Sequence, residues 1–105
     1  MSNIDKTIEN NQLYDYYKNL LTEKQRSYFE LYFFEDLTLQ EISEEFDVSR
    51  NAVHDSINKT INILNDLESK LKIKQKNEFI KENLEKLKDN KMSISEFYDL
   101  IEGEL

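Results

Sequence analysis

Proline is absent from the 105 residues of this chain, and its one glycine, Gly103, lies near the C-terminal end. A β-sandwich or β-barrel needs many turn residues, and glycine and proline are the commonest of them. Leu, Ile, Glu, Lys and Asn dominate the composition instead. The sequence therefore predicts an all-α protein, a small helical bundle, and its length fits one domain or one small domain with a tail.

Residues 38–60, TLQEISEEFDVSRNAVHDSINKT, predict two helices joined by a tight turn. Thr38 is a good N-cap, and Glu41 completes a capping box with it. Asp47 tolerates the left-handed conformation of a sharp turn, and Ser49 is the second N-cap. Apolar residues recur at helical spacing on both sides of the turn, which Val48 can fill: Leu39, Ile42 and Phe46 before it, and Ala52, Val53, Ile57 and Thr60 or Ile61 after it. This pattern predicts a helix-turn-helix unit.

The second helix of this unit presents polar side chains away from its apolar face. Arg, Asn and His are residue types that pair with base edges or phosphates. The predicted DNA contacts are Ser49, Arg50, Asn51, His54, Asp55, Asn58 and Lys59. Other uses stay open, because Arg50 could neutralise Glu44 or Asp47, the asparagines could be ordinary exposed residues, and the whole motif could be a core element.

Further helices are expected on both sides of the motif. They cover residues 4–21 and 23–35, a long continuation of the second motif helix to about residue 71, and, after a break near 70–75, residues 76–89 and about 94–103. Residues 1–71 then form the helix-turn-helix domain, and residues 72–105 form the C-terminal helices. The inner face of the first helix should hold Ile4, Ile8, Leu13, Tyr16, Tyr17, Leu20 and Leu21, with a weak point at Asn10-Asn11. The last helix has an apolar face of Ile94, Phe97, Tyr98 and Ile101 that must pack on the domain or on a second copy.

The helix over residues 23–35 is apolar over too broad a face for one stripe, which predicts a central core helix. Its apolar residues are Tyr28, Phe29, Leu31, Tyr32, Phe33 and Phe34. Stacking of these rings on nucleic-acid bases is the alternative use, although core packing is the commoner one.

The net charge of −8 argues against a nonspecific nucleic-acid binder, which is usually basic. The acids of the motif lie on its first helix and turn, whereas residues 49–60 carry Arg50 and Lys59 against Asp55. The expected reading face is therefore not acidic, but its binding to phosphates should be weak. The lysines at 70, 72, 74 and 76 could touch a phosphate backbone or form a solvated face.

Several function classes have no support in the residues. The chain has no cysteine, no basic and apolar leader and no apolar run that could span a membrane, which fits a cytoplasmic protein without membrane insertion. The lone histidine, His54, has no cysteine or second histidine with which to hold zinc. Its neighbours Asp55 and Ser56 do not face it on a helix. We therefore expect no enzyme activity, no metal and no cofactor.

The segment LTEKQRSYFELYFFEDLTLQEISEEFDVSRNAVHDSINKT resembles the YlxM-like family, small bacterial helix-turn-helix proteins that are similar to region 4 of sigma factors. LTEKQR at 21–26 matches a helix start of the family, LYFFEDLTLQEI at 31–42 the entry into its helix-turn-helix, and EEFDVSRNAV at 44–53 its turn and recognition-helix start. The resemblance covers about residues 10–71 well and the C-terminal third loosely. It implies a four-helix core with a sigma-like helix-turn-helix that binds DNA.

The resemblance also bears on single residues and on the biological setting. Ser49, Arg50 and Asn51 stand where the family begins its recognition helix. The family usually has Tyr in place of His54 and a basic pair in place of Asn58-Lys59, so this chain has one positive charge fewer for phosphate contact. Genes of the family typically lie beside those for signal recognition particle components, which implies a regulatory role in that pathway.

Two hypotheses of function follow. The first is a DNA-binding transcription regulator, dimeric through its C-terminal helices, that binds double-stranded DNA and regulates signal recognition particle pathway genes. The alternative is a protein–protein interaction module that acts on RNA polymerase, the ribosome or the signal recognition particle without direct DNA binding. The acidic balance of the chain favours this alternative, because it suits a basic protein partner better than naked DNA.

Overall fold

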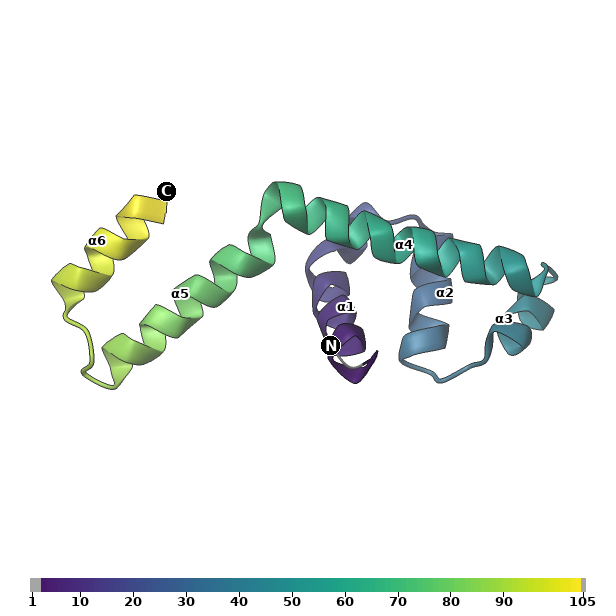
Figure 1. The fold of residues 1–105 in the computed structure, drawn as a ribbon, viewed down its shortest axis with the longest axis horizontal. Helices are drawn as coiled ribbons and strands as arrows, with labels where there is room; N and C mark the ends of the chain where they lie inside the picture. The colour runs from purple at the N-terminus through teal and green to yellow at the C-terminus, as the bar shows by residue number, and fades with distance from the viewer. Residues whose placement is uncertain (1–2, 105) are drawn as a thin grey trace. The chain divides into compact units, whose positions relative to one another are not determined.

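The computed structural model describes residues 3–104, and their side chains from residue 6 onward. This part of the chain forms α-helices and one 3-10 helix, with no strand, which confirms the all-α prediction. The elements are α1 (Asn3–Tyr17), η1 (Lys18–Leu20), α2 (Glu23–Phe33), α3 (Leu39–Phe46), α4 (Arg50–Leu71), α5 (Ile73–Lys88) and α6 (Ile94–Glu104) (Figure 1). The chain divides into two compact units, Met1–Lys70 and Leu71–Leu105.

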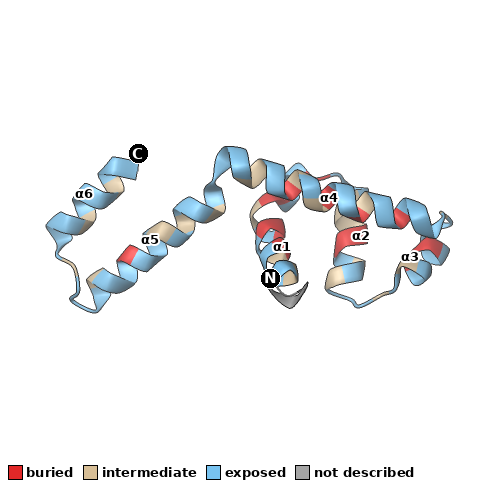
Figure 2. Cartoon of the chain, viewed as in Figure 1, coloured by how far each residue is buried: buried red, intermediate tan, exposed pale blue. Residues whose placement is uncertain are grey.

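In the first unit, α1, α2 and α3 lie on one side of the long helix α4 (Figure 1). Two apolar clusters lie along α4, and Figure 2 shows their buried residues on the facing sides of these helices. The first cluster contains Leu13, Tyr14, Tyr17, Leu21, Phe29 and Leu64. The second contains Tyr28, Ile42, Val53 and Ile57. Because the neighbours Tyr28 and Phe29 enter different clusters, α2 is the central core helix that its broad apolarity predicted.

Aromatic rings join the helices of this core. Tyr14 of α1 stacks on Phe29 of α2 with ring centroids 4.4 Å apart, and Tyr28 of α2 meets Phe46 of α3 edge to face at 5.0 Å. The buried tyrosine hydroxyls also have partners, since Tyr14 donates a hydrogen bond to Glu30 and Tyr17 donates one to Glu68. Core packing therefore accounts for the buried aromatic side chains.

The first helix differs from the expected one in three respects. Leu20 is 63% exposed, because α1 ends at Tyr17 and the tighter 3-10 turn of η1 moves the following side chains out of phase. Ile8 is also exposed. α1 runs without interruption through Asn10, which is buried, so the expected weak point at Asn10-Asn11 is wrong. The remaining expected position, Ile4, lies outside the described side chains.

In the second unit, α5 and α6 pack against each other. α5 begins at Ile73, directly after Lys72 in the left-handed region at φ 55°, so the expected break falls on a single residue. Among the described residues of this unit, the one buried side chain is Asn83, whose amide donates to the Phe79 carbonyl at 2.8 Å. Every described apolar side chain of the unit is partly or fully exposed. None of the described helices of the protein is long and apolar enough to cross a membrane.

Candidate nucleic-acid interface

The entry to the helix-turn-helix is held by the capping box that the sequence predicts. The backbone amide of Glu41 donates to the Thr38 hydroxyl at 3.0 Å, and the backbone amide of Thr38 donates to the Glu41 carboxylate at 3.0 Å. The pKa of the Glu41 carboxyl is lowered mainly by the hydrogen bond from the Thr38 backbone amide and to a smaller extent by the hydrogen bond with the Thr38 side chain. The start of α3 is therefore fixed by groups within one helical turn.

The turn between α3 and α4 also has its expected geometry. Asp47 adopts the left-handed conformation, with φ 54° and ψ 48°, and the amide of Val48 donates to the Ser43 carbonyl at 3.0 Å. Val48 packs, partly buried, against the second cluster. The Ser49 hydroxyl accepts a hydrogen bond from the Ala52 amide at 3.0 Å. α4 therefore begins at Arg50 with its N-cap in place.

All of the predicted DNA contacts are exposed, but they do not form a single stripe. Successive residues of an α-helix are rotated by about 100°. Relative to the buried Val53 and Ile57, this rotation places Asn51 and Asp55 near the middle of the open face. Lys59 lies about 140° around the helix from His54. The predicted face is therefore broad, with His54 on one flank and Lys59 on the other.

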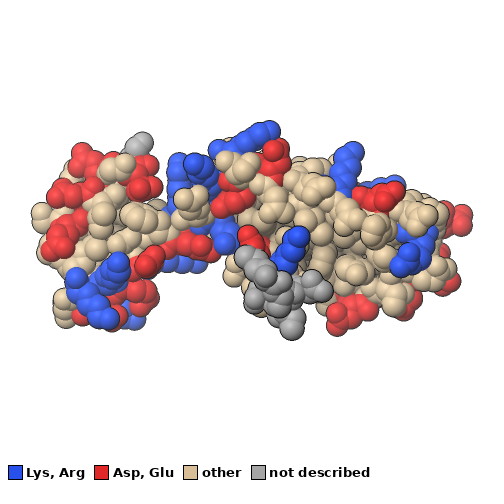
Figure 3. All heavy atoms as spheres, in the orientation of Figure 1, with Lys and Arg blue, Asp and Glu red and all other residues tan. Residues whose placement is uncertain are grey.

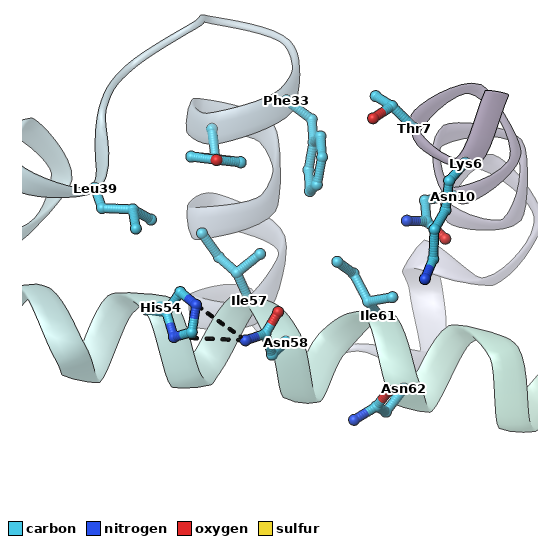
Figure 4. A pocket seen from close by; sticks show the side chains of 11 residues that line it. Lys6, Thr7, Asn10, Phe33, Leu39, His54, Ile57, Asn58, Ile61 and Asn62 are labelled. Carbon is cyan, nitrogen blue, oxygen red and sulfur yellow. Dashed lines mark hydrogen bonds between the residues drawn. The ribbon is translucent and has the colours of Figure 1, made fainter. Parts of the chain in front are cut away.

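The flank of α4 that carries His54 borders a hollow between the helices of the first unit. This hollow has a volume of about 530 Å³. Figure 4 shows His54 and Asn58 along α4, with Ile57 and Ile61 directed toward the other helices. All four α-helices of the unit line this hollow: Lys6, Thr7 and Asn10 of α1, Tyr32 and Phe33 of α2, Leu39 of α3, and His54, Ile57, Asn58, Ile61 and Asn62 of α4.

Arg50 belongs to the same flank. It lines a second hollow, of about 520 Å³, which shares Thr7, Tyr32, Phe33 and Leu39 with the first. Sequence reasoning missed Asn62, although it stands four residues after Asn58 on the same side of α4. It also missed Lys6, Thr7 and Asn10, for which the sequence holds no signal, because α1 meets α4 across some fifty residues of chain.

The polar side chains of the predicted interface differ in whether they already contact a neighbouring side chain. The amide nitrogen of Asn58 lies 3.3 Å from His54 Nε2, and His54 Nδ1 lies 3.5 Å from an Asp55 carboxylate oxygen. Arg50 forms no ion pair with any described residue, Glu44 and Asp47 included, and neither does Lys59. These two cations are therefore available to an anionic ligand.

The wider surface is not strongly basic. On the face drawn in Figure 3, basic and acidic side chains lie interspersed rather than gathered into one basic surface. Two lysines of the 70–76 run are paired within their own helices, Lys70 with Asp66 at 2.9 Å and Lys74 with Glu78 at 2.8 Å. Lys70 lies on a solvated helix face, where such pairs are typical, whereas the Lys74 side chain is only 16% exposed. In the described part of the chain, no group of three or more His, Cys, Asp or Glu side chains is placed to hold a metal ion.

A protein-family model described as "Putative helix-turn-helix protein, YlxM / p13 like" matches residues 4–103. The chain belongs to this family. A YlxM / p13-like relative from Mycoplasma capricolum subsp. capricolum is 47% identical over 94 residues, which cover 90% of this chain and 83% of the relative. A relative from Halalkalibacterium halodurans is 50% identical over 86 residues, or 82% of this chain and 79% of the relative. The predicted membership is confirmed, and the match extends through the C-terminal helices.

Proposed function

We propose that this YlxM / p13-like protein is a DNA-binding regulator whose helix α4 enters the major groove of double-stranded DNA. The observation that carries the proposal is the exposed first half of α4, where Arg50 and Lys59 lack an ion-pair partner among the described residues. Arginine and asparagine pair with guanine and adenine edges, and aspartate accepts from the cytosine amino group, so Arg50, Asn51 and Asp55 are the proposed base contacts. Ser49, His54, Asn58 and Lys59 complete the proposed interface.

The charge of the chain shapes the binding that we expect. Residues 38–61 carry two basic and five acidic side chains, so few phosphates can be neutralised. Affinity for DNA should therefore depend only weakly on salt and should rest largely on base contacts. We propose a cytoplasmic location. We also propose genes of the signal recognition particle pathway as the first targets to examine, because the family resemblance implies a role in that pathway.

The experiment that tests this function measures binding of the full chain to labelled duplex fragments of the native genome at several salt concentrations. Arg50→Ala should weaken binding to selected fragments about 5- to 150-fold, as expected for loss of a base contact of roughly 1–3 kcal/mol. Lys59→Ala should weaken binding to all fragments and reduce the salt slope by about one. Lys18→Ala, which removes one exposed charge from η1, outside both the proposed DNA interface and the second unit, is the matched control and should change neither quantity.

The opposite outcome is also informative. Absence of binding at low salt, or binding that is unchanged in Arg50→Ala and Lys59→Ala, would overturn the proposed interface. The function would then be that of a protein–protein interaction module acting on RNA polymerase, the ribosome or the signal recognition particle. The specific observation that favours this second function is the net charge of −8, which suits a basic protein surface.

We further propose that the regulator is a homodimer held by its second unit. The described part of this unit has no fully buried apolar side chain, and a unit of this size cannot build a stable core alone. Ile94 and Tyr98 of α6 are 77% and 64% exposed, so α5 covers only part of the predicted apolar face. Residues 72–91 carry seven basic and four acidic side chains, whereas residues 92–105 carry four acidic and none basic. A second copy can therefore match both apolar surface and charge.

Sedimentation equilibrium of the full chain tests the homodimer. Ile94→Asp combined with Tyr98→Asp should convert a dimer into a monomer with largely unchanged helical circular dichroism, because both positions are exposed and aspartate is favourable at position 94, the first residue of α6. A wild-type protein that is monomeric at high concentration would overturn the dimer.

A further inference from the structure

A second surface of the first unit lies between α2 and α3 and shares no residue with the proposed DNA interface. It is a groove of about 420 Å³, here called the α2–α3 groove, lined by Ser27, Glu30, Leu31, Glu35, Leu37, Glu45 and Phe46. Leu31 and Leu37 form part of its floor and pack, partly buried, against the second cluster. Phe46 is 40% exposed although its ring meets Tyr28 edge to face. The groove therefore presents an apolar floor to solvent.

The rim of the α2–α3 groove is acidic on both sides. Glu30 belongs to α2, Glu35 follows it, and Glu45 belongs to α3. None of the lining residues is basic, and none of these three carboxylates forms an ion pair with a described residue. Glu30 accepts a hydrogen bond from Tyr14, which keeps its position fixed but leaves its charge uncompensated. The groove thus combines exposed apolar surface with three unpaired negative charges.

We propose that the α2–α3 groove binds an amphipathic helix of a basic partner protein. Apolar side chains at successive turns of such a helix would cover Leu31, Leu37 and Phe46, as in other helix-in-groove complexes. Lysine or arginine side chains beside that apolar stripe would meet Glu30, Glu35 and Glu45, which supplies charge complementarity. The same carboxylates repel phosphates, so a nucleic acid does not fit this surface. This inference does not rest on the proposed binding of DNA.

Fluorescence anisotropy with a designed peptide tests the groove on the full chain. The probe is a fluorescein-labelled amphipathic helix with leucines at i, i+3, i+4 and i+7 and lysines on both sides of that stripe. A scrambled peptide of the same composition separates shape from charge. We expect saturable binding of the designed helix, and binding at least about tenfold weaker for the scrambled peptide.

Charge-reversed variants locate the binding. Glu35→Lys combined with Glu45→Lys should weaken peptide binding at least about tenfold, because both rim charges become repulsive. Glu82→Lys combined with Glu85→Lys makes the same change of net charge at exposed positions of α5 and should leave the affinity unchanged. Arg50→Ala should also leave it unchanged, which distinguishes this surface from the proposed DNA interface.

Three outcomes would overturn the proposal. Equal affinity for the designed and the scrambled peptide would show attraction by net charge alone. Unchanged binding by the Glu35→Lys, Glu45→Lys variant would exclude the rim. Amide chemical shifts of the labelled protein provide the third test: peptide-induced shifts at Leu31, Leu37 and Phe46 support the groove, whereas shifts confined to other residues exclude it.

Discussion

At the scale of single residues, the core of the first unit depends on tyrosines that are both buried and hydrogen bonded. Tyr14 is almost completely buried, stacks on Phe29 and donates its hydroxyl hydrogen to Glu30. Burial, followed by the hydrogen bond to the Glu30 carboxylate, raises the pKa of the Tyr14 hydroxyl well above its ordinary value. The folded protein therefore favours the neutral phenol, and this preference makes stability depend on pH.

Replacing Tyr14 by phenylalanine should have an effect that changes with pH. Near neutral pH, we expect the free energy of unfolding to fall by about 1 kcal/mol, because Glu30 loses its donor. Because the pKa of Tyr14 is higher in the folded state, its contribution to stability is complete below the unfolded pKa of about 10. This contribution is lost as the pH rises further. The wild type should therefore lose stability above about pH 10 more steeply than Tyr14→Phe. Urea denaturation near neutral pH and above about pH 10 measures the two effects, and Tyr98→Phe, at an exposed position, is the control. Equal losses of stability at high pH in the wild type and in Tyr14→Phe would contradict a raised pKa of Tyr14.

At the scale of helices, two capping boxes of the same geometry differ in one chemical respect. Thr38 pairs with the ionisable Glu41 at the start of α3, and Thr22 pairs with the neutral Gln25 at the start of α2. Each box lies within a single turn of helix, which is why the Thr38–Glu41 box could be predicted from the sequence. The same locality holds for Asp47 and Ser49, which place the start of α4, and for Ser93, whose hydroxyl accepts from the Glu96 amide at 3.1 Å.

The two boxes should therefore respond differently to acid. Thr38→Ala and Thr22→Ala should each lower the free energy of unfolding by about 1 kcal/mol near neutral pH. The lowered pKa of Glu41 contributes stability above its unfolded value of about 4.3, and this contribution is lost as the pH falls through the folded value. Thr38→Ala removes only the side-chain part of this contribution, because the backbone amide at position 38 remains. The cost of Thr38→Ala should therefore shrink by this smaller part in acid, whereas the cost of Thr22→Ala should stay constant. Chemical denaturation as a function of pH tests this, and an equal pH dependence of the two costs would refute it.

At the scale of the whole molecule, the buried apolar side chains of the described residues all belong to the first unit. Leu64 is completely buried in the cluster that joins α1, α2 and α4, whereas Leu20 lies exposed beside the same region. Leu64→Ala should lower the free energy of unfolding by about 3 kcal/mol, because it leaves a cavity that the core cannot fill. Leu20→Ala, the same deletion, should cost less than about 0.5 kcal/mol. Thermal and urea unfolding compare the two, and similar losses would mean that the core does not lie where the clusters place it.

The sequence by itself determined the features that depend on neighbouring residues. Helical periodicity, the capping residues and the left-handed Asp47 placed the helix-turn-helix, and the family resemblance agreed with the family match. The DNA contacts at Arg50 and its neighbours remain a prediction, since exposure alone does not show what a side chain binds.

Only the tertiary structure decided which neighbours those faces meet. It placed Lys6 and Thr7 of α1 across a hollow from His54 (Figure 4), and it left Leu20 largely exposed and Phe46 partly exposed. It also formed the acidic α2–α3 groove from two separate helices. Periodicity shows which side of a helix is apolar, but the identity of the partner depends on contacts between residues far apart in the chain. Local hydrogen bonds therefore place the helices, and long-range packing decides which surfaces remain free to bind.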